Sequence, residues 1–431
     1  MPQSPRPTPT RRAMLQASAA ASVALTTRSA WATPRATAND RINLGFIGIG
    51  MMGRGHLGGF LNHGDVQVVA VCDVEQTRLK NAQEQVEAKY AQATRDGNYS
   101  GCAAYGDFRE LLARDDIDAV VIATPDHWHV LNCMHAIKAG KDIYCEKPLT
   151  HHIGEGRKLV DMVRAHDTVF QTGSQQRSEF GGKFRTAVDA IRAGRIGELR
   201  TVRVGVGGPP VACDLPEQEA PADVDWEMWV GPAPYRGYSE VLCPKGMHGH
   251  FPAFRNYREY AGGGLADMGA HHFDIAQWAM DRDASGPTRI IPPGPDATTG
   301  LRFVYDDGVE MFHGGPSGCT FEGTEGMIYV DRGELRSEPA AALEQPLPDT
   351  APRVYLSEDH KRNWLDCIRS RKRPICDVEI GHRSASICHL ANIGYRLGRE
   401  LAWDPRAERF DDDEANQLLN RDPRGPWTYD V

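Results

Sequence analysis

The chain has 431 residues, of which 41% are apolar, 25% charged and 8% aromatic. This composition is typical of a globular protein and excludes a fibrous or disordered chain, and the length predicts two or three domains. The formal net charge of -9 argues against a nucleic-acid partner, because binding to phosphates needs a clustered positive field.

The first 32 residues differ in charge from the rest of the chain, because all their charged residues are arginines. The pair Arg11-Arg12 precedes a mild apolar run over 17–25 and the small-residue pattern Ala30-Trp31-Ala32. In this order, the features predict a twin-arginine (Tat) export signal over residues 1–32. The Tat machinery is then a partner, and the mature protein is periplasmic or otherwise exported.

The alternative for this segment is a disordered basic tail. The apolar run is too short to span a bilayer, since a membrane helix needs about 20 apolar residues, and no other spanning segment is predicted. A polar linker follows over residues 33–41. Without the first 32 residues the chain has 45 basic and 58 acidic residues, a net charge of -13.

The ten cysteines are scattered along the chain and form no CxxC pair. Several lie in apolar runs, where a cysteine behaves as a small hydrophobic residue. The spacing therefore predicts no disulfide framework, although a single bridge is compatible with it.

A dinucleotide-binding fingerprint begins after the linker. An apolar run over 42–47 leads into Gly48-Ile49-Gly50-Met51-Met52-Gly53, and a second apolar run over 66–72 ends at Asp73. Strand, glycines, helix, second strand and acidic residue in one unit predict a nucleotide-binding βαβ fold. The alternative is a glycine turn in an unrelated βαβ unit.

Each position of the fingerprint has a physical role. Gly48 permits the tight turn, Gly50 lets a pyrophosphate approach backbone N–H groups, and Gly53 lets the helix pack on the strand. Asp73 would accept hydrogen bonds from the adenosine ribose hydroxyls and would repel a 2′-phosphate. The sequence therefore favours NAD over NADP.

Strands and helices continue to alternate after the fingerprint. A polar insertion over 87–101 interrupts them, and the later segments are helices over 108–113, 128–139 and 153–165 and strands over 119–123, 142–145 and 169–172. This order predicts an α/β, doubly wound parallel sheet, a Rossmann domain over 42–170. Strand-like runs between long Pro/Gly-rich loops then predict a second domain over 171–431, with C-terminal helices that pack back on the first domain.

Three local clusters follow the fingerprint: 123–129 (ATPDHWH), 145–149 (CEKPL) and 262–274 (GGGLADMGAHHFD). Together they resemble the Gfo/Idh/MocA family of glucose-fructose oxidoreductases and inositol dehydrogenases, over essentially the whole mature chain. The resemblance implies an NAD(P)-dependent oxidoreductase with an α+β second domain around a large, mostly antiparallel open sheet. It also implies a homodimer or homotetramer formed through that sheet. One departure is Asp126, where the family more often has Asn.

The resemblance places Lys147, Asp267 and His271 beside the nicotinamide as catalytic residues. The residue chemistry agrees, because a hydride leaves an alcohol carbon only as its hydroxyl proton is removed, and histidine is a common base. Asp267 and His271 are predicted on one helix, four residues apart, and Lys147 follows a strand end, where ligands bind in such sheets. Taken singly, the lysine is more often a surface charge and the DxxxH pair a structural contact.

Further contacts are predicted around this centre. The expected cofactor contacts, besides the fingerprint, are Thr124, Pro125, Trp128, His129, Glu146, Lys147 and Gln175. Arg177, His248, Tyr257 and His272 are candidates for binding substrate. A zinc set made of histidines near 248–250 and 271–272 is the alternative interpretation, and the proposed chemistry needs no metal.

The leading hypothesis is an exported oxidoreductase with tightly bound NAD that transfers hydride to or from a secondary alcohol of a sugar, inositol or glycoside. The first alternative is a redox-neutral, NAD-dependent glycoside hydrolase or lyase that oxidises the sugar transiently. In such hydrolases of the family the lysine of the EKP motif is replaced, so Lys147 favours the dehydrogenase. The second alternative is a non-catalytic sugar sensor.

Overall fold

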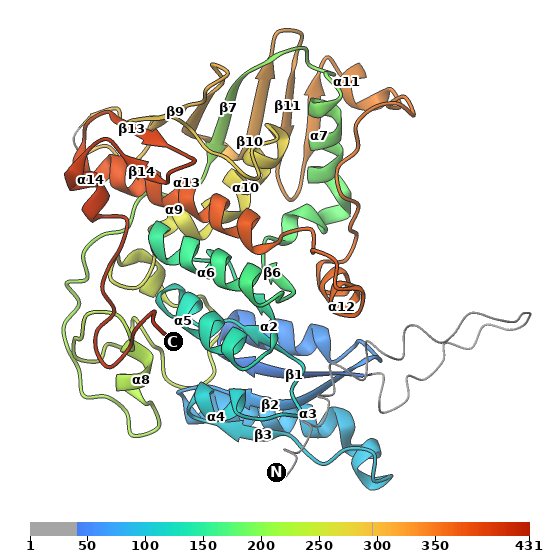
Figure 1. Cartoon of the computed structure of the whole chain (residues 1–431), viewed down its shortest axis with the longest axis vertical. Coiled ribbons are helices and arrows are strands. Elements are labelled where there is room, and N and C mark those ends of the chain that lie inside the picture. The colour runs from blue at the N-terminus through green and yellow to red at the C-terminus, as the bar shows by residue number, and fades with distance from the viewer. Residues whose placement is uncertain (1–40, 295) are drawn as a thin grey trace, which may run out of the picture.

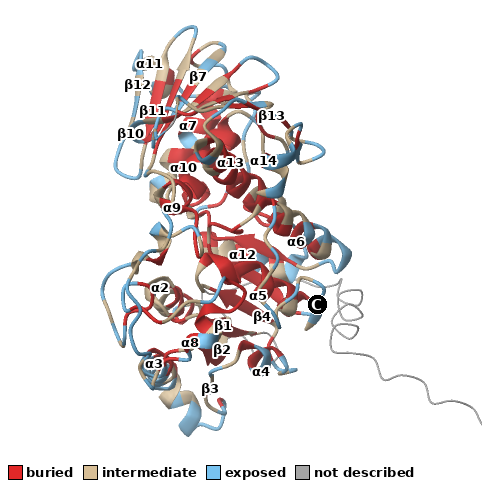
Figure 2. Ribbon diagram, turned by 90° about the vertical axis from the view of Figure 1, so that its left-hand side faces the viewer, coloured by how far each residue is buried: buried red, intermediate tan, exposed pale blue. Residues whose placement is uncertain are grey.

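The computed structural model describes residues 41–294 and 296–431. The predicted export signal over 1–32 and nearly all of the linker lie outside the described residues. Two halves stack along the long axis of the molecule, with the first domain at the bottom of Figure 1 and the second domain at the top. Figure 2 shows buried residues in the interior of both halves and in the region where they meet.

The first half is a six-stranded parallel sheet in the order β3-β2-β1-β4-β5-β6. Its strands are β1 (Ile42–Ile47), β2 (Val66–Cys72), β3 (Ala103–Tyr105), β4 (Ala119–Ile122), β5 (Asp142–Cys145) and β6 (Phe170–Thr172). The helices between them are α2 (Met51–Phe60), α3 (Gln76–Arg95), α4 (Phe108–Leu112), α5 (Asp126–Lys138) and α6 (Ile153–Ala165). All four residues of β4 are buried, as expected for a central strand covered on both faces.

The predicted Rossmann fold is confirmed, with two corrections. The sheet includes β6, so the domain extends past the predicted boundary at residue 170. The segment over 87–101, predicted as a polar insertion, is helical as far as Arg95. The prediction was wrong there because α3 buries only a narrow stripe of apolar side chains, Leu79, Ala82 and Val86, so its sequence is mostly polar. Its other face is rich in Gln, Glu, Lys and Ala, which favour helices without burial.

The second half contains an eight-stranded, mostly antiparallel sheet in the order β12-β11-β10-β9-β8-β13-β14, with β7 paired to β10. Its strands are β7 (Leu199–Gly205), β8 (Arg289–Ile291), β9 (Arg302–Val304), β10 (Glu310–Gly323), β11 (Met327–Val330), β12 (Leu335–Glu338), β13 (Leu401–Asp404) and β14 (Arg409–Phe410). The longer helices are α7 (Lys183–Arg192), α10 (Gly269–Ala279), α12 (His360–Ser370) and α13 (Val378–Leu397). Figure 1 shows α7, α10 and α13 on the face of this sheet that is turned toward the first domain.

Short helices complete the second half: α8 (Trp226–Val230), α9 (Gly263–Asp267), α11 (Ala341–Glu344), α14 (Asp413–Gln417) and the 3-10 turns η1 (Gln175–Arg177), η2 (Phe180–Gly182) and η3 (Ala253–Asn256). As predicted, part of the C-terminal region returns to the first domain. Trp364 and Leu365 of α12 are buried in the core of the first domain, and Trp427 packs on Trp128 at a centroid distance of 4.7 Å. All ten cysteines are free thiols, and nine are buried.

Candidate active site

The glycine loop has the geometry that the fingerprint predicts. Gly48 has φ +88°, which favours glycine, and a Cβ on Gly53 would lie 2.0 Å from the carbonyl oxygen of Gly48. Among the described residues, apart from its two neighbours in the chain, no atom lies within 4 Å of the Cβ position of Gly50, so the backbone there is open to a ligand. The start of α2 therefore presents backbone N–H groups at an open surface suited to a pyrophosphate.

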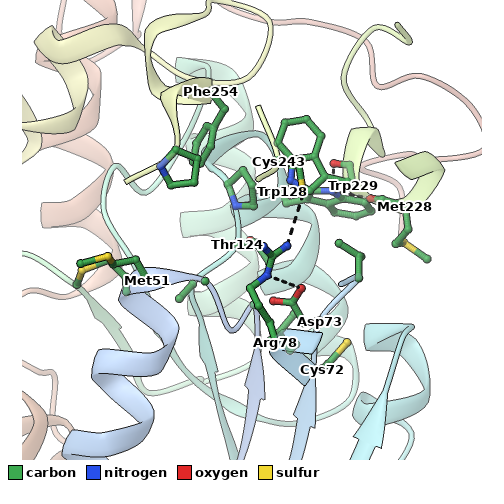
Figure 3. Close-up of a pocket in the computed structure, with 18 of the residues that line it drawn as sticks. Met51, Cys72, Asp73, Arg78, Thr124, Trp128, Met228, Trp229, Cys243 and Phe254 are labelled. Atoms are coloured by element: carbon green, nitrogen blue, oxygen red, sulfur yellow. Dashed lines mark hydrogen bonds and ion pairs between the residues drawn. The ribbon is translucent and has the colours of Figure 1, made fainter. Parts of the chain in front are cut away.

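Asp73 directly follows β2, as predicted. Its Oδ2 accepts a hydrogen bond from the Ile49 backbone N–H at 2.6 Å, and the side chain is buried. Arg78 donates to Asp73 from Nε at 3.5 Å and to Sγ of Cys243 from Nη2 at 3.5 Å (Figure 3). Its Nη1 also donates to the Pro244 carbonyl at 2.8 Å. The prediction missed Arg78, although an arginine five residues after the acidic residue was a visible signal. Its charge lies where it would partly offset the repulsion of a 2′-phosphate by Asp73.

The nucleotide pocket lies between both domains. On the first-domain side it is lined by most of the predicted cofactor contacts: Gly48, Gly50, Met51, Met52, Asp73, Thr124, Pro125 and Trp128. The opposite wall comes from second-domain residues such as Leu242, Pro252 and Phe254. Arg54 of α2 donates to the His248 carbonyl at 2.5 Å, which fastens this wall to the glycine loop.

Trp128 contributes to this pocket as a packing residue. Its indole N–H donates to the Trp229 carbonyl at 3.0 Å, and its ring contacts Phe108 and Trp427. It lines the pocket together with Phe108 and Asp73, at the end that would hold the adenosine. The described lining of the catalytic cleft does not include Trp128.

A second, adjoining cavity holds the predicted catalytic residues. Lys147 follows β5, and its Nζ donates to Oδ1 of Asp267 at 2.7 Å and to the Asp267 carbonyl at 3.0 Å. We call this cavity, of about 190 Å³, the catalytic cleft. Its lining residues are Met52, Ala123, Thr124, Asp126, His129, Glu146, Lys147, Gln175, Phe251, Arg255, Asp267, Met268, His271 and Arg332.

Asp267 and His271 lie on two successive helices and not on one. Asp267 is the last residue of α9, and His271 belongs to α10, which begins at Gly269. Glycines around this segment favour a break, which the one-helix prediction overlooked. Both side chains still line the cleft, and Met268, which links the two helices, itself has right-handed helical backbone angles (φ -88°, ψ -23°).

His271 is 4% exposed, and its Nδ1 has no hydrogen-bond partner among the described residues. Burial, and then the positive charge of Lys147, lower the pKa of His271 well below its ordinary value. Burial alone would raise the pKa of Asp267, but the charges of Lys147 and Arg255 hold it below its ordinary value. The site therefore combines a neutral imidazole, an ionised carboxylate and an ammonium group.

Glu146 and His129 line the cleft and are held in place by bonds to neighbouring groups. Glu146 Oε1 lies 2.6 Å from Nε2 of His56; burial alone would raise the pKa of Glu146, but the bond to His56 and the nearby charges, including that of Lys147, together hold it below its ordinary value. The two ring nitrogens of His129 lie 2.7 Å from the Pro148 carbonyl and 2.9 Å from the Thr124 carbonyl. His129 thus joins the Lys147 loop to the end of β4.

Three cleft residues were not predicted to act there. Arg255 lies 3.7 Å from Asp267 Oδ1, and Arg332 donates to Gln176 at 3.0 Å. Burial raises the pKa of Asp126 to about 7, although the charge of Arg255 opposes the rise. Arg332 lies two residues after β11, and only the fold brings it and Arg255 to the cleft.

The four candidate substrate residues are not among the residues that line the cleft. Arg177 is buried and bonded to Asp274 and Asp283, both within the second domain. His272 is buried, His248 lines the nucleotide pocket, and Tyr257 lies in the loop before α9. Arg177 is therefore a structural residue, and the contacts expected of the others are not supported.

The histidines of the zinc interpretation are dispersed. Nδ1 of His248 is bonded to the His250 carbonyl at 2.8 Å, and His271 and His272 belong to α10 in the second domain. Within residues 41–294 and 296–431, no three His, Cys, Asp or Glu side chains gather as metal ligands. No helix in the same ranges is long and apolar enough to cross a membrane.

Comparison with known families decides the classification. A model described as "Oxidoreductase family, NAD-binding Rossmann fold" matches residues 42–174, and one described as "Oxidoreductase family, C-terminal alpha/beta domain" matches residues 211–429. The chain belongs to the Gfo/Idh/MocA family. It is therefore a member of an oxidoreductase family whose first domain binds a nicotinamide cofactor.

Relatives in sequence cover only part of this Gfo/Idh/MocA chain. A glycosyl hydrolase family 109 protein of Shewanella sp. (strain ANA-3) is 31% identical over 162 residues, which is 37% of this chain and 34% of the relative. One from Shewanella pealeana is 29% identical over 160 residues, with the same shares. The chain thus matches about a third of the length of these relatives.

Solved structures share the fold over most of the chain. The WlbA dehydrogenase of Bordetella pertussis, in complex with NADH and UDP-GlcNAcA, has a TM-score of 0.58 at 17% identity. The myo-inositol 2-dehydrogenase of Lactobacillus plantarum has a TM-score of 0.55 at 17% identity. Each likeness covers 84% of this chain and 99% of the other, and at this identity it shows the fold.

Proposed function

We propose that this Gfo/Idh/MocA protein is an NAD-dependent oxidoreductase that acts on a secondary alcohol of a sugar, inositol or glycoside. The observation that carries the proposal is the contact of Lys147 with Asp267 in a cleft that also holds His271 and adjoins the nucleotide pocket. The position of Asp73 favours NAD over NADP. When bound, the nicotinamide would accept or supply the hydride.

The side chains of the cleft bind the substrate oxygen, transfer the proton and hold these groups in position. Lys147 holds the substrate oxygen and stabilises negative charge on it as the proton leaves. The neutral imidazole of His271 accepts that proton during oxidation and returns it during reduction. Asp267 fixes the position of the Lys147 ammonium and remains available to bond a neighbouring hydroxyl.

Substitution of the two central residues tests this assignment. We expect His271→Asn and Lys147→Met each to lower kcat by about 10²- to 10⁴-fold while NAD affinity changes by no more than a few-fold. His272→Asn is the matched control, because this neighbouring histidine does not line the cleft. Full activity in His271→Asn would refute the proton-transfer role.

A redox-neutral glycoside hydrolase is the second candidate, because the relatives in sequence are named glycosyl hydrolase family 109 proteins. The retained Lys147 supports the dehydrogenase instead. A nitrophenyl glycoside separates the two functions. Release of nitrophenol without net NADH would favour the hydrolase, whereas NADH formation from free sugars or polyols would favour the dehydrogenase.

We further propose that the protein is exported through the Tat pathway and carries its NAD with it. The Arg11-Arg12 pair and the residues after it support export. Retention of the cofactor is supported by the hydrogen bonds that Arg54 and Arg78 donate to second-domain carbonyls, because these two bonds connect the first-domain and second-domain sides of the nucleotide pocket. Free NAD is not expected outside the cytoplasm, so a second substrate or another acceptor would regenerate the cofactor.

We also propose a homodimer or homotetramer formed through the face of the eight-stranded sheet opposite α7, α10 and α13. The strands of this sheet alternate buried and more exposed side chains, as in β7. Light scattering on the purified protein would measure the oligomer, and a monomer at micromolar concentration would contradict the proposal.

A further inference from the structure

A third cavity lies where the start of α6 meets the second half of α13, and its described lining shares no residue with the nucleotide pocket or the catalytic cleft. We call it the arginine cavity. Its volume is about 540 Å³, within the range of small-molecule sites, roughly 300–1,000 Å³. Both domains contribute to it, the first through His151 and His152 and the second through loops around 209, 258, 297 and 420.

Three arginines line the arginine cavity: Arg258, Arg396 and Arg421. Arg258 and Arg396 are exposed, and Arg421 is partly buried with one bond, from Nη1 to the Glu259 carbonyl at 2.9 Å. Among the described residues, no carboxylate lies within ion-pair distance of any of them, whereas most arginines near α13, such as Arg383 and Arg399, are paired. Asp296 is the only acidic residue in the described lining.

The positive charge of Arg421 is only partly balanced by the groups around it. Burial lowers the pKa of its guanidinium, and the more distant Glu155 and Glu259 only partly oppose this effect. A buried cation without a close anion is unfavourable, because desolvation of the charge is not repaid by a partner. An anion in the cavity would supply the missing interaction.

Neutral polar groups in the wall also lack partners. His151 is 8% exposed and its Nδ1 has no hydrogen-bond partner in the described chain, nor does Oδ1 of Asn392. Asn392 is held in place by a bond from Nδ2 to the Gly262 carbonyl at 3.0 Å. A ligand with hydroxyl or other polar groups beside its anionic group would satisfy these atoms.

We propose that the arginine cavity binds a small organic molecule that carries phosphate or carboxylate groups, at a site separate from the cofactor and the reacting alcohol. The three guanidinium groups supply charge and forked donors that match either oxyanion. The volume is more than a single inorganic ion needs, so the site suits an anionic group attached to a polar body.

Calorimetric titration with pyrophosphate and with citrate at low ionic strength tests the proposal on the full chain. We expect at least one of them to bind, and Arg258→Gln and Arg396→Gln each to weaken binding about tenfold. Both substitutions replace exposed side chains, so the fold should be retained, as a thermal melt would check. Arg399→Gln, next to the end of α13 but outside the cavity, is the matched control and should leave affinity unchanged.

The two probes distinguish the source of the charge. Binding of pyrophosphate alone would assign a phosphorylated ligand, binding of citrate alone a carboxylated one, and binding of both would support the shared oxyanion chemistry. Absence of binding to both probes would overturn the proposal. So would binding that NAD displaces and that Arg258→Gln and Arg396→Gln leave unchanged, because the anion would then occupy the nucleotide pocket.

Discussion

At the scale of single residues, Asp126 shows how the cleft alters ordinary chemistry. It is 7% exposed, and burial raises its pKa to about 7 from an unfolded value near 3.8. The folded state therefore holds more protons than the unfolded state between these two values, so this residue makes the protein less stable as pH rises through that window.

The substitution Asp126→Asn removes this titration. We expect the variant to exceed wild type in free energy of unfolding at pH 8 by up to about 4 kcal/mol, and the difference to shrink toward zero near pH 4. Urea denaturation across this pH range measures both. Asp161→Asn, at an exposed position on α6, is the control and should show no such trend. A difference that does not depend on pH would contradict the buried, protonated carboxyl.

The glycine loop gives a second prediction at this scale. Gly53→Ala would force its Cβ against the Gly48 carbonyl, so we expect a loss of about 1–3 kcal/mol in stability and weaker NAD binding. Gly55→Ala is matched, because it lies on the same helix with no atom within 4 Å of its Cβ position, and it should gain up to about 1 kcal/mol. Thermal denaturation and NAD titration of both variants measure these effects.

At the scale of elements, an ion-pair network joins α6, α13 and the turn between β13 and β14. Arg157 of α6 lies 2.9 Å from Glu379 and 2.8 Å from Glu408, and Glu408 also bonds Nε2 of His382 at 2.8 Å. Burial opposes ionisation, but the bonds from Arg157 and Arg383 lower the pKa of Glu379 to about 2. Because α6 follows the Lys147 loop, the network holds this loop against the second domain.

We expect Glu408→Gln to lower the free energy of unfolding by about 1–3 kcal/mol at pH 7, since Arg157 and Arg383 each lose one of two carboxylate partners and keep only Glu379. The folded-state pKa of these carboxylates is depressed, so the stabilisation is present above about pH 4.5 and is lost as pH falls toward 2. Chemical denaturation at several pH values checks this. Glu414→Gln removes an exposed pair with Arg399 and should cost less than about 1 kcal/mol.

The elements also show what the sequence could predict. Continuous apolar runs such as those of β1 and β4 predicted the parallel strands correctly. A strand that is buried on both faces carries apolar residues at successive positions, and such a run is easily recognised in a sequence. The 14-residue β10 was missed, because Gly314, Gly315 and Pro316 in its middle are typical of a loop, and its pairing with β7 across a bulge is a long-range contact. Likewise, Arg255 and Arg332 reach the cleft only through tertiary structure, whereas Lys147, Asp267 and His271 belong to local motifs.

At the scale of the whole molecule, both domains build every cavity described above. The nucleotide pocket, the catalytic cleft and the arginine cavity are each lined by residues from the first and second domains. A cofactor bound between them would therefore link the domains and stabilise the folded chain by mass action. This arrangement is consistent with the proposal that the protein is exported with its cofactor bound.

Export itself is tested by substitution of the arginine pair. We expect Arg11→Lys together with Arg12→Lys to abolish export, because the predicted signal depends on this pair. Cell fractionation and immunoblotting measure the distribution. Arg6→Lys, a charge-preserving change outside the pair, should be exported normally. Equal export of the double variant and wild type would contradict the Tat signal.

The central claim is that the cleft transfers hydride between a secondary alcohol and a bound nicotinamide. The most direct measurement incubates NAD-loaded protein with sugars and inositols deuterated at their carbinol carbons, followed by mass spectrometry of the released nucleotide. We expect at least one substrate to transfer deuterium to the nicotinamide in wild type and His271→Asn to reduce this transfer by about 10²-fold or more. A protein that binds no nicotinamide nucleotide, or a bound nucleotide that never acquires deuterium from any of these substrates, would contradict it.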